Sequence, residues 1–387
     1  MSSDRIYLDY NATSPLSESV KSWIKSGEVI FANPSSQHSS GKSSRKLINE
    51  SRKEIYDTFH LDEKKTSLFF HSGATEAMNT YARSFAEWTR REGRDLLIAL
   101  SSVDHPAVTS LADTFLGPHV TTLELARDKS LHYLHSENLQ KLKGLKKTNP
   151  DLVILYHHLW VHNETGLISP LNELNQLREI PDLFIHVDAV QAPGKIPDWQ
   201  QINDRDIFSF SAHKFGAFKG VGFSFMPLGM PFFPMLVGGG QQQNLRSGTE
   251  NPVTVHTVAL ALQDLKKISV NSMAEKKKLL LEFMKTELGD CGTVIDAQPT
   301  NSNTIYFYLK NLSSDIALAL FDLNGIMISS GSACSSGTAK ASVILEHMGL
   351  SSVARNGLRL SLPFCLTDQE FLNIQQKLRV ILEKIKK

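Results

Sequence analysis

Six short apolar runs recur along this chain up to residue 226, and most are separated by segments with helical spacing. The runs cover residues 67–70, 95–100, 152–158, 183–189, 206–212 and 220–226. Helices are predicted between them over 76–87, 107–115 and 172–179. Continuously apolar strands that alternate with helices are typical of parallel sheets buried on both faces. The alternation therefore predicts an α/β fold with a mostly parallel sheet covered by helices.

The pattern changes after about Pro252. A long helical stretch, broken near 269–271, precedes an apolar strand, an amphipathic helix, a Gly/Ser-rich loop, a second strand and a closing helix. These elements are expected over 253–288, 303–309, 315–325, 329–337, 357–362 and 368–387. We therefore expect a smaller α+β domain, with residues 15–255 forming the large domain and residues 1–14 and 256–387 forming the small one.

Charge and composition exclude several classes of function. The 387 residues carry 41 basic and 40 acidic side chains, so no overall basic field favours nucleic acid or an anionic membrane. No apolar run approaches the roughly 20 residues that a membrane helix needs, and the start resembles no secretory signal. Three cysteines, without a CxxC pair or a His/Cys cluster, argue against a disulfide framework or a zinc site. We expect a cytoplasmic protein without a metal.

Polar residues that follow the predicted strands are the first candidates for a site, because ligands of open α/β sheets bind beyond the carboxyl ends of strands. The segment Ser72–Thr75 joins a strand to a helix, and such a junction either binds an anion or simply caps the helix. Asp188 ends an apolar strand, where a buried carboxylate needs a partner. That partner is either a protonated pyridine nitrogen or a neighbouring turn. The residues alone leave both pairs of alternatives open.

Lys214 follows another strand, within the sequence Ser-Ala-His-Lys. A lysine in this position condenses with an aldehyde when burial or a neighbouring cation lowers its pKa. Most lysines are surface residues instead. The chain order favours the reactive interpretation, because Gly-Ala-Thr, Asp188 and Lys214 each stand at a strand end.

Taken together, these motifs resemble those of fold-type-I pyridoxal 5′-phosphate (PLP) enzymes, and within them the class V aminotransferase superfamily. The chain is most similar to the cysteine desulfurase family that supplies sulfur for iron–sulfur clusters. The resemblance extends from residue 6 to 362. The matching segments read IYLDYNATSPL, FANPSS, HSGATEAMN, DHPAV, HNETG, HVDAVQ, SFSAHK, GGGQ, LRSGTENP, SSGSAC and RLSL.

The resemblance assigns roles around the cofactor. It implies that Lys214 is the Schiff-base lysine, that Asp188 pairs with the pyridine nitrogen and that Gln191 bonds the phenolic oxygen. It also implies a catalytic His105 stacked on the ring, with Asn163 near the phenolic oxygen and the substrate. The residues implied to hold the phosphate are Ala74, Thr75, Ser211, His213 and, from the neighbouring subunit, Thr249. A homodimer with shared sites follows from that last role.

The three cysteines are expected to differ in reactivity. Cys334 lies in a small, polar, glycine-rich loop, so its thiol is expected to be accessible. Cys291 has the sequence context of a turn, and Cys365 follows apolar residues as a buried structural cysteine would. The match to SSGSAC implies that Cys334 takes sulfur from L-cysteine as a persulfide and leaves L-alanine.

For the substrate carboxylate, Arg359 is favoured by family position, with Arg355 as its rival and Asn33 as an assisting residue. The chain departs from the family pattern at His162, at Ala217-Phe218 and in the segment after GGGQ. These changes affect partner contacts more than chemistry. The chain also stops soon after its last predicted helix, which leaves open whether sulfur passes to an iron–sulfur scaffold, to a tRNA-thiolation relay or to another acceptor protein.

Two alternatives remain at this point. Another PLP enzyme of the superfamily, such as an aminotransferase, a selenocysteine lyase or an epimerase, would keep Lys214 and Asp188 but would not need Cys334. A partner-binding relative without catalysis would need none of the three.

Overall fold

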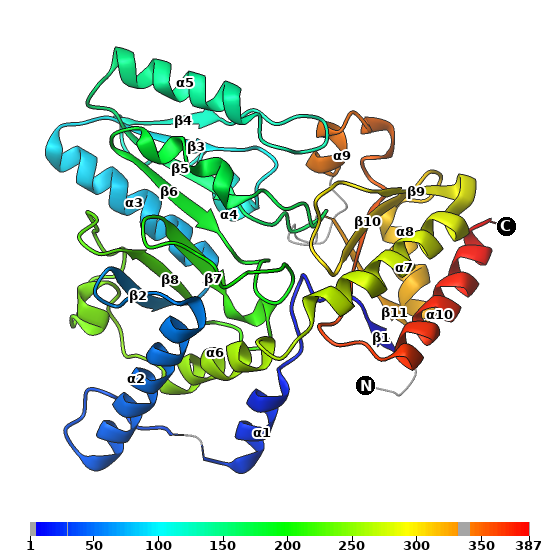
Figure 1. Cartoon of the computed structure of the whole chain (residues 1–387), viewed down its shortest axis with the longest axis horizontal. Helices are drawn as coiled ribbons and strands as arrows, with labels where there is room; N and C mark the ends of the chain where they lie inside the picture. The colour runs from blue at the N-terminus through cyan, green and yellow to red at the C-terminus, as the bar shows by residue number, and fades with distance from the viewer. Residues whose placement is uncertain (1–4, 29, 332–340, 387) are drawn as a thin grey trace.

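The computed structural model describes residues 5–28, 30–331 and 341–386, and contains a large sheet and a small sheet (Figure 1). The large sheet has the strand order β2-β8-β7-β6-β5-β3-β4, in which β8 is antiparallel to both of its neighbours and the other pairs are parallel. Its strands are β2 (Thr66–His71), β3 (Leu96–Leu100), β4 (Val120–Glu124), β5 (Val153–Leu159), β6 (Leu183–Asp188), β7 (Ile207–Ser211) and β8 (Gly222–Pro227). The predicted mostly parallel sheet is confirmed.

The edge strand β4 escaped prediction, because its residues Val-Thr-Thr-Leu-Glu are partly exposed and form no apolar run. The six predicted strands are buried almost throughout. Continuous hydrophobicity therefore identified the five central strands and the buried edge strand β2, but missed the partly exposed edge strand β4.

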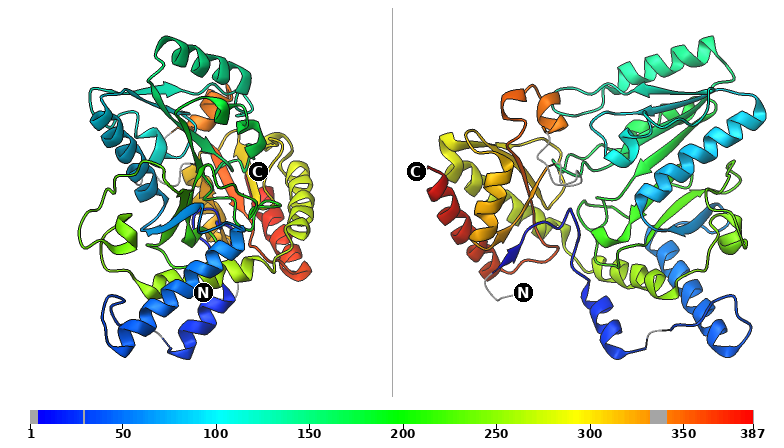
Figure 2. Two further views of the ribbon diagram at one scale, coloured as in Figure 1. Left: turned by 60° about the vertical axis from the view of Figure 1, so that its left-hand side comes forward. Right: turned by 180° about the vertical axis from the view of Figure 1, so that it is seen from behind.

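Helices cover both faces of the large sheet (Figures 1 and 2). On one face lies α3 (Ala74–Glu92), whose buried Ala77, Tyr81 and Phe85 recur every four residues and pack on the sheet. It ends at Gly93, which has the left-handed backbone (φ 66°) common after helices. The helices on the other face are α1 (Glu18–Ser26), α2 (Ser39–Phe59), α5 (His135–Thr148) and α6 (Pro252–Leu265).

Two of the predicted helices differ from the structure: one is much shorter than predicted, and the other consists of 3₁₀ turns. The segment 107–115 contains only the short α4 (Pro106–Thr109), followed by turns. The segment 172–179 forms two 3₁₀ turns, η1 (Leu171–Leu174) and η2 (Leu177–Glu179). The second ends at Ile180, which is extended (φ −78°, ψ 121°) because it precedes a proline.

The small sheet is antiparallel, in the order β12-β13-β10-β9, with one face packed against three helices. Its strands are β9 (Gly292–Ile295), β10 (Thr304–Leu309), β12 (Ser329–Ser330) and β13 (Gly357–Ser361). The helices are α7 (Val270–Leu288), α8 (Ser314–Leu323) and α10 (Asp368–Lys386), and the short α9 (Val343–His347) packs on the opposite face. Near the N-terminus, β1 (Ile6–Tyr7) pairs with β11 (Ile326–Met327).

The predicted domain boundary at residue 255 falls inside α6. The buried residues Val258, Leu262 and Leu265 of this helix pack in the core beneath the large sheet. We therefore propose that the large domain extends to the junction between α6 and α7, where Ser269 caps the second helix through a hydrogen bond from Ser272 N.

None of the helices in the described part of the chain combines the length and the hydrophobicity needed to cross a membrane.

Candidate active site

The carboxyl ends of β2, β6 and β7 bring several of the predicted residues to one edge of the large sheet. His71 at the end of β2 and Ser211 at the end of β7 flank the same residue of β8, Gly222. Asp188 ends the adjacent strand β6. The chain segments that follow these three strands, including Lys214, therefore meet at this edge.

Anion donors lie at the ends of β2 and β7. A Cβ atom placed on Gly73 would stand 3.6 Å from the hydroxyl oxygen of Ser211, so the two turns lie close together. Ala74 and Thr75 form the first turn of α3, a 19-residue helix whose N-terminus carries partial positive charge. The imidazole Nδ1 of His213 lies 3.2 Å from the hydroxyl of Thr13. These groups are suited to hold a phosphate.

Asp188 is buried, and its side chain accepts a hydrogen bond from Val190 N at 3.0 Å. Burial raises the pKa of this carboxyl to about 7, and Lys214 opposes the shift. A nearby cation would favour the ionised form of Asp188. The arrangement suits a cationic ligand group at the end of β6.

Lys214 Nζ donates hydrogen bonds of 2.9 Å to the main-chain oxygens of Asn11 and Ala12. Burial, followed by the positive charge of Lys214, lowers the pKa values of His105 and His213 to about 4. Both imidazoles are therefore neutral near pH 7. His105 caps α4, because its Nδ1 accepts a hydrogen bond from Ala107 N at 3.1 Å.

Gln191 faces the N-terminal segment. Its Nε2 donates to Asn11 O at 3.0 Å, and its Oε1 accepts from Lys195. Asn163 lies next to the same segment, with its main-chain oxygen 3.4 Å from Asn11 Nδ2.

Arg359 lies on β13 of the small sheet, buried and directed toward the same N-terminal segment. Its Nη2 donates to Asp9 Oδ1 at 2.8 Å and its Nη1 to Asn163 O at 3.1 Å. Its Nε is buried and has no hydrogen-bond partner among the described residues. The rival Arg355 is exposed, so burial next to the site favours Arg359 as the residue that binds a carboxylate.

Asn33 and Thr249 lie apart from these residues, and both are exposed. Their sequence neighbours Pro34, Ser35 and Glu250 line one surface hollow of about 450 Å³ between α2 and the segment after Gly238. Within this chain the structure does not bring either residue to Lys214.

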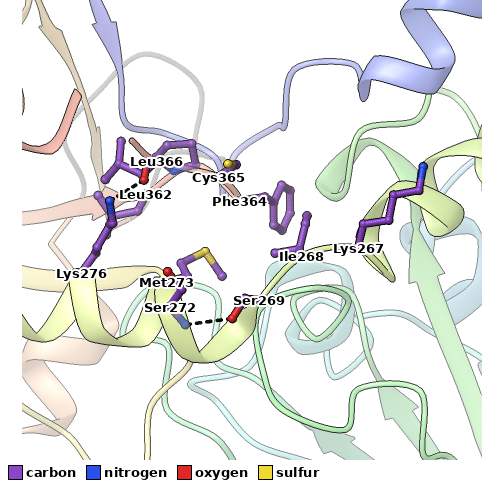
Figure 3. Close-up of a pocket in the computed structure, with 11 residues that line it drawn as sticks. Lys267, Ile268, Ser269, Ser272, Met273, Lys276, Leu362, Phe364, Cys365 and Leu366 are labelled. Atoms are coloured by element: carbon purple, nitrogen blue, oxygen red, sulfur yellow. Dashed lines mark hydrogen bonds between the residues drawn. The ribbon is translucent and has the colours of Figure 1, made fainter. Parts of the chain in front are cut away.

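Cys334 lies outside the described residues, and one expectation about the other cysteines is wrong. Cys291 lies in a 3₁₀ turn, as predicted, but Cys365 is exposed rather than buried. Cys365 lines a pocket of about 280 Å³ between the α6–α7 junction and the segment after β13. Figure 3 shows its thiol beside Phe364 at this pocket. The apolar neighbour Phe364 packs edge-on against Tyr10 and lines the same pocket.

Sequence reasoning gave no role to several polar residues of this edge. Asp9 pairs with Arg359, and Asn11 accepts hydrogen bonds from Lys214 and Gln191. Glu164 lies near Arg359, and burial raises the pKa of its carboxyl to about 7. Asp9 and Asn11 belong to the motif IYLDYNATSPL, so the sequence contained a signal that could have identified them. Glu164 belongs to the motif HNETG, and its neighbours in the sequence gave no further indication of a role.

The residues at this edge are able to hold PLP. Asp188 offers a buried carboxylate for a cationic ring nitrogen, Ser211 and the N-terminus of α3 offer donors for a phosphate, and Lys214 offers an amine. Aldehyde, cation and phosphate are the three groups that PLP combines, so the donor set fits the cofactor.

Comparison with known proteins agrees with this chemistry. The family model for aminotransferase class-V matches residues 6–371, so the chain belongs to the aminotransferase class-V family. It is 31% identical to an IscS-like cysteine desulfurase of Mycobacterium tuberculosis over 92% of this chain and 91% of that protein. It is 30% identical to the cysteine desulfurase IscS of Dictyoglomus turgidum over 98% of this chain and 95% of that protein. Within the class, the chain therefore belongs to the cysteine desulfurase family.

Solved structures give the same result. A NifS-like protein superposes with a TM-score of 0.83 at 26% identity, covering 98% of this chain and 100% of the other. SspA in complex with cysteine superposes with a TM-score of 0.76 at 25% identity, covering 93% of this chain and 99% of the other.

Proposed function

We propose that this protein is a PLP-dependent cysteine desulfurase, which converts L-cysteine to L-alanine and transfers the sulfur to Cys334 as a persulfide. The observation that carries the proposal is the meeting of Lys214, the buried Asp188 and the phosphate donors at one sheet edge. Membership of the cysteine desulfurase family supports it.

When bound, PLP supplies an electron sink for the negative charge that develops at the substrate Cα. Asp188 keeps the ring nitrogen protonated, since the cation and the carboxylate stabilise each other in a buried site. Lys214 anchors the cofactor and takes up the Cα proton. His105 is the less suitable base, because its Nδ1 already accepts from Ala107 N and its proton therefore lies on Nε2. We assign His105 to stacking and hydrogen-bond donation.

Arg359 binds the substrate carboxylate in this proposal. Two of its nitrogens are fixed by Asp9 and the main chain of Asn163, and Nε remains as a buried donor without a partner in the described residues. A carboxylate there would satisfy it.

In the sulfur transfer, the substrate Cβ–S bond breaks and a bond forms between that sulfur and Cys334 Sγ. The electron pair of the broken bond stays on carbon, which is protonated to give L-alanine. Cysteine and thiol thus become alanine and persulfide, with no external oxidant or reductant.

The wider setting of the enzyme is part of the proposal. We propose a cytoplasmic homodimer in which Thr249 of one subunit reaches the phosphate of the other, with Asn33 close by. Its sulfur passes to an acceptor protein such as an iron–sulfur scaffold. The exposure of both residues beside one surface hollow is consistent with a contact between subunits.

The test is sulfide release from L-cysteine with a reductant present, for the wild type, Cys334→Ala and Cys365→Ala. Cys365→Ala is the matched control, because Cys365 is exposed beside a separate pocket. We expect Cys334→Ala to abolish release while the yellow colour of bound PLP remains, and Cys365→Ala to retain the wild-type rate. An unchanged rate in Cys334→Ala contradicts the sulfur step, and a protein that stays colourless with PLP contradicts the whole proposal.

A further inference from the structure

Lys195 is fully buried next to the site, yet neither the sequence motifs nor the mechanism above assign it a role. Its relative exposure is 0%, and the hydrogen-bond partners of its amine among the described residues are amide oxygens, not carboxylates. Burial, followed by the positive charges of Lys214 and Arg359, lowers its pKa well below the usual range. A lysine buried without a carboxylate partner is costly, so its position calls for an explanation.

The hydrogen bonds of Lys195 go to two amide oxygens. Its Nζ donates to Gln191 Oε1 at 2.5 Å and to Asn11 Oδ1 at 3.1 Å. Charged or neutral, a lysine amine carries enough N–H groups to donate to both acceptors.

This donor fixes the orientation of the Gln191 amide. Because Oε1 is held by Lys195, the NH₂ group points the other way, and one of its N–H bonds goes to Asn11 O at 3.0 Å. The same oxygen accepts from Lys214 Nζ at 2.9 Å. An amide NH₂ carries two N–H bonds, so a second donor remains on this nitrogen, which shares the acceptor Asn11 O with Lys214.

We propose that Lys195 is a positioning residue, which holds the Gln191 amide with its N–H donors toward the phenolic oxygen of bound PLP. The inference rests on the proposed function, because it takes Gln191 as the partner of that oxygen. Without Lys195 the amide is held in this orientation by the bond to Asn11 O alone, so it turns over more readily. After such a turn its own oxygen would face the phenolic oxygen without a proton between them.

Lys277 provides a matched control, because it is the same kind of residue in a different place. It lies on α7, is 6% exposed, and donates 2.6 Å hydrogen bonds to Thr300 Oγ1 and Asn301 O. Neither acceptor belongs to the residues around Lys214. Replacing Lys277 therefore measures the general effect of removing a buried lysine amine.

The experiment compares Lys195→Met with Lys277→Met in three measurements: thermal stability without cofactor, PLP affinity by titration, and the visible spectrum of the loaded protein. We expect both variants to change in stability. Only Lys195→Met should bind PLP about three- to tenfold more weakly, the range of one lost hydrogen bond. It alone should also shift the visible band, since hydrogen bonds to the ring tune its electronics.

A Lys195→Met protein that matches Lys277→Met in affinity and spectrum overturns the inference. A wild-type protein that binds no PLP overturns the proposed function instead, so the two failures are distinguishable.

Gln191→Glu keeps the test decisive if Lys195→Met does not fold. Glutamate retains an oxygen for Lys195 but loses the N–H donors. We expect this variant to bind PLP at least about threefold more weakly. Its stability does not discriminate, because the substitution also removes the donor to Asn11 O. Unchanged PLP affinity would show that the Gln191 donors do not contact the cofactor, which overturns the inference.

Discussion

The two sheets of this protein bury different kinds of side chain. On and beside the large sheet lie ionisable groups that burial keeps neutral or shifts toward neutrality, namely His71, His157, His158, His162, His186 and Asp188. The core between the small sheet and its three helices is aliphatic and aromatic, and Arg359 is the charged residue that β13 directs toward the site. On this basis we propose that the large sheet holds the cofactor, while the small sheet supplies Arg359 for the substrate and its strand β12 is followed in sequence by the segment that contains Cys334.

Removing Lys214 should have the largest effect on catalysis. We expect Lys214→Ala to lower the rate of L-alanine formation by about 10³-fold or more, as for other residues that bond covalently in catalysis. The exposed Lys219 is the control, and Lys219→Ala should stay within about twofold of the wild type. Substantial activity in Lys214→Ala would show that Lys214 is not required for catalysis, which contradicts its role as the cofactor-binding lysine.

Asp188→Asn should lower activity by about 10²- to 10³-fold, in the range found when one preorganised electrostatic group is removed. The same change should stabilise the cofactor-free protein at higher pH. Burial raises the folded-state pKa of Asp188 from 3.8 to about 7, so the folded state holds this proton more tightly than the unfolded chain.

The contribution of Asp188 to the free energy of unfolding is therefore greatest at low pH and falls as the pH rises from about 4 to about 7. Chemical denaturation over this range should show that the free energy of unfolding of Asp188→Asn increases relative to that of the wild type as the pH rises. A difference that does not change with pH would mean that Asp188 is not buried as a lone carboxyl.

Arg359→Lys tests the contribution of the small sheet. We expect the KM for L-cysteine to rise about tenfold, because a single lysine ammonium cannot both replace the bonds to Asp9 and Asn163 and supply the donor that Arg359 Nε offers to the carboxylate, while PLP affinity stays unchanged. Arg355→Lys, at an exposed position, should leave KM unaltered. A loss of PLP binding in Arg359→Lys would show that the small sheet also contributes to cofactor binding.

Leu360→Ala should have the smallest effect on the chemistry. Leu360 is fully buried on β13, so the truncation should lower the free energy of unfolding by about 2–5 kcal/mol. The visible spectrum of bound PLP in the folded protein should remain that of the wild type. An altered spectrum would mean that the aliphatic core of the small sheet shapes the cofactor site directly.

How far sequence predicted this site depends on where each signal lies. Asp188 and Lys214 were found because each follows a continuous apolar strand, and that local pattern fixes their place at the sheet edge. Cys365 was predicted buried from its apolar neighbours, and the prediction was wrong because the chain leaves the core after Leu362, which is buried, so that Cys365 is exposed beside a surface pocket.

Lys195 could not be predicted by such patterns. Its function depends on Asn11, which lies 184 positions away along the chain, and on an amide orientation that only the folded structure defines. The helix over 107–115 failed for a related reason, since apolar spacing was present but the backbone continues as turns after Thr109.

Mass spectrometry of the protein after incubation with L-cysteine tests the central claim most directly. The account predicts one added sulfur on the peptide that contains Cys334, with Cys291 and the exposed Cys365 unmodified. Sulfur on Cys365 in place of Cys334, or no added sulfur while L-alanine forms, would contradict it.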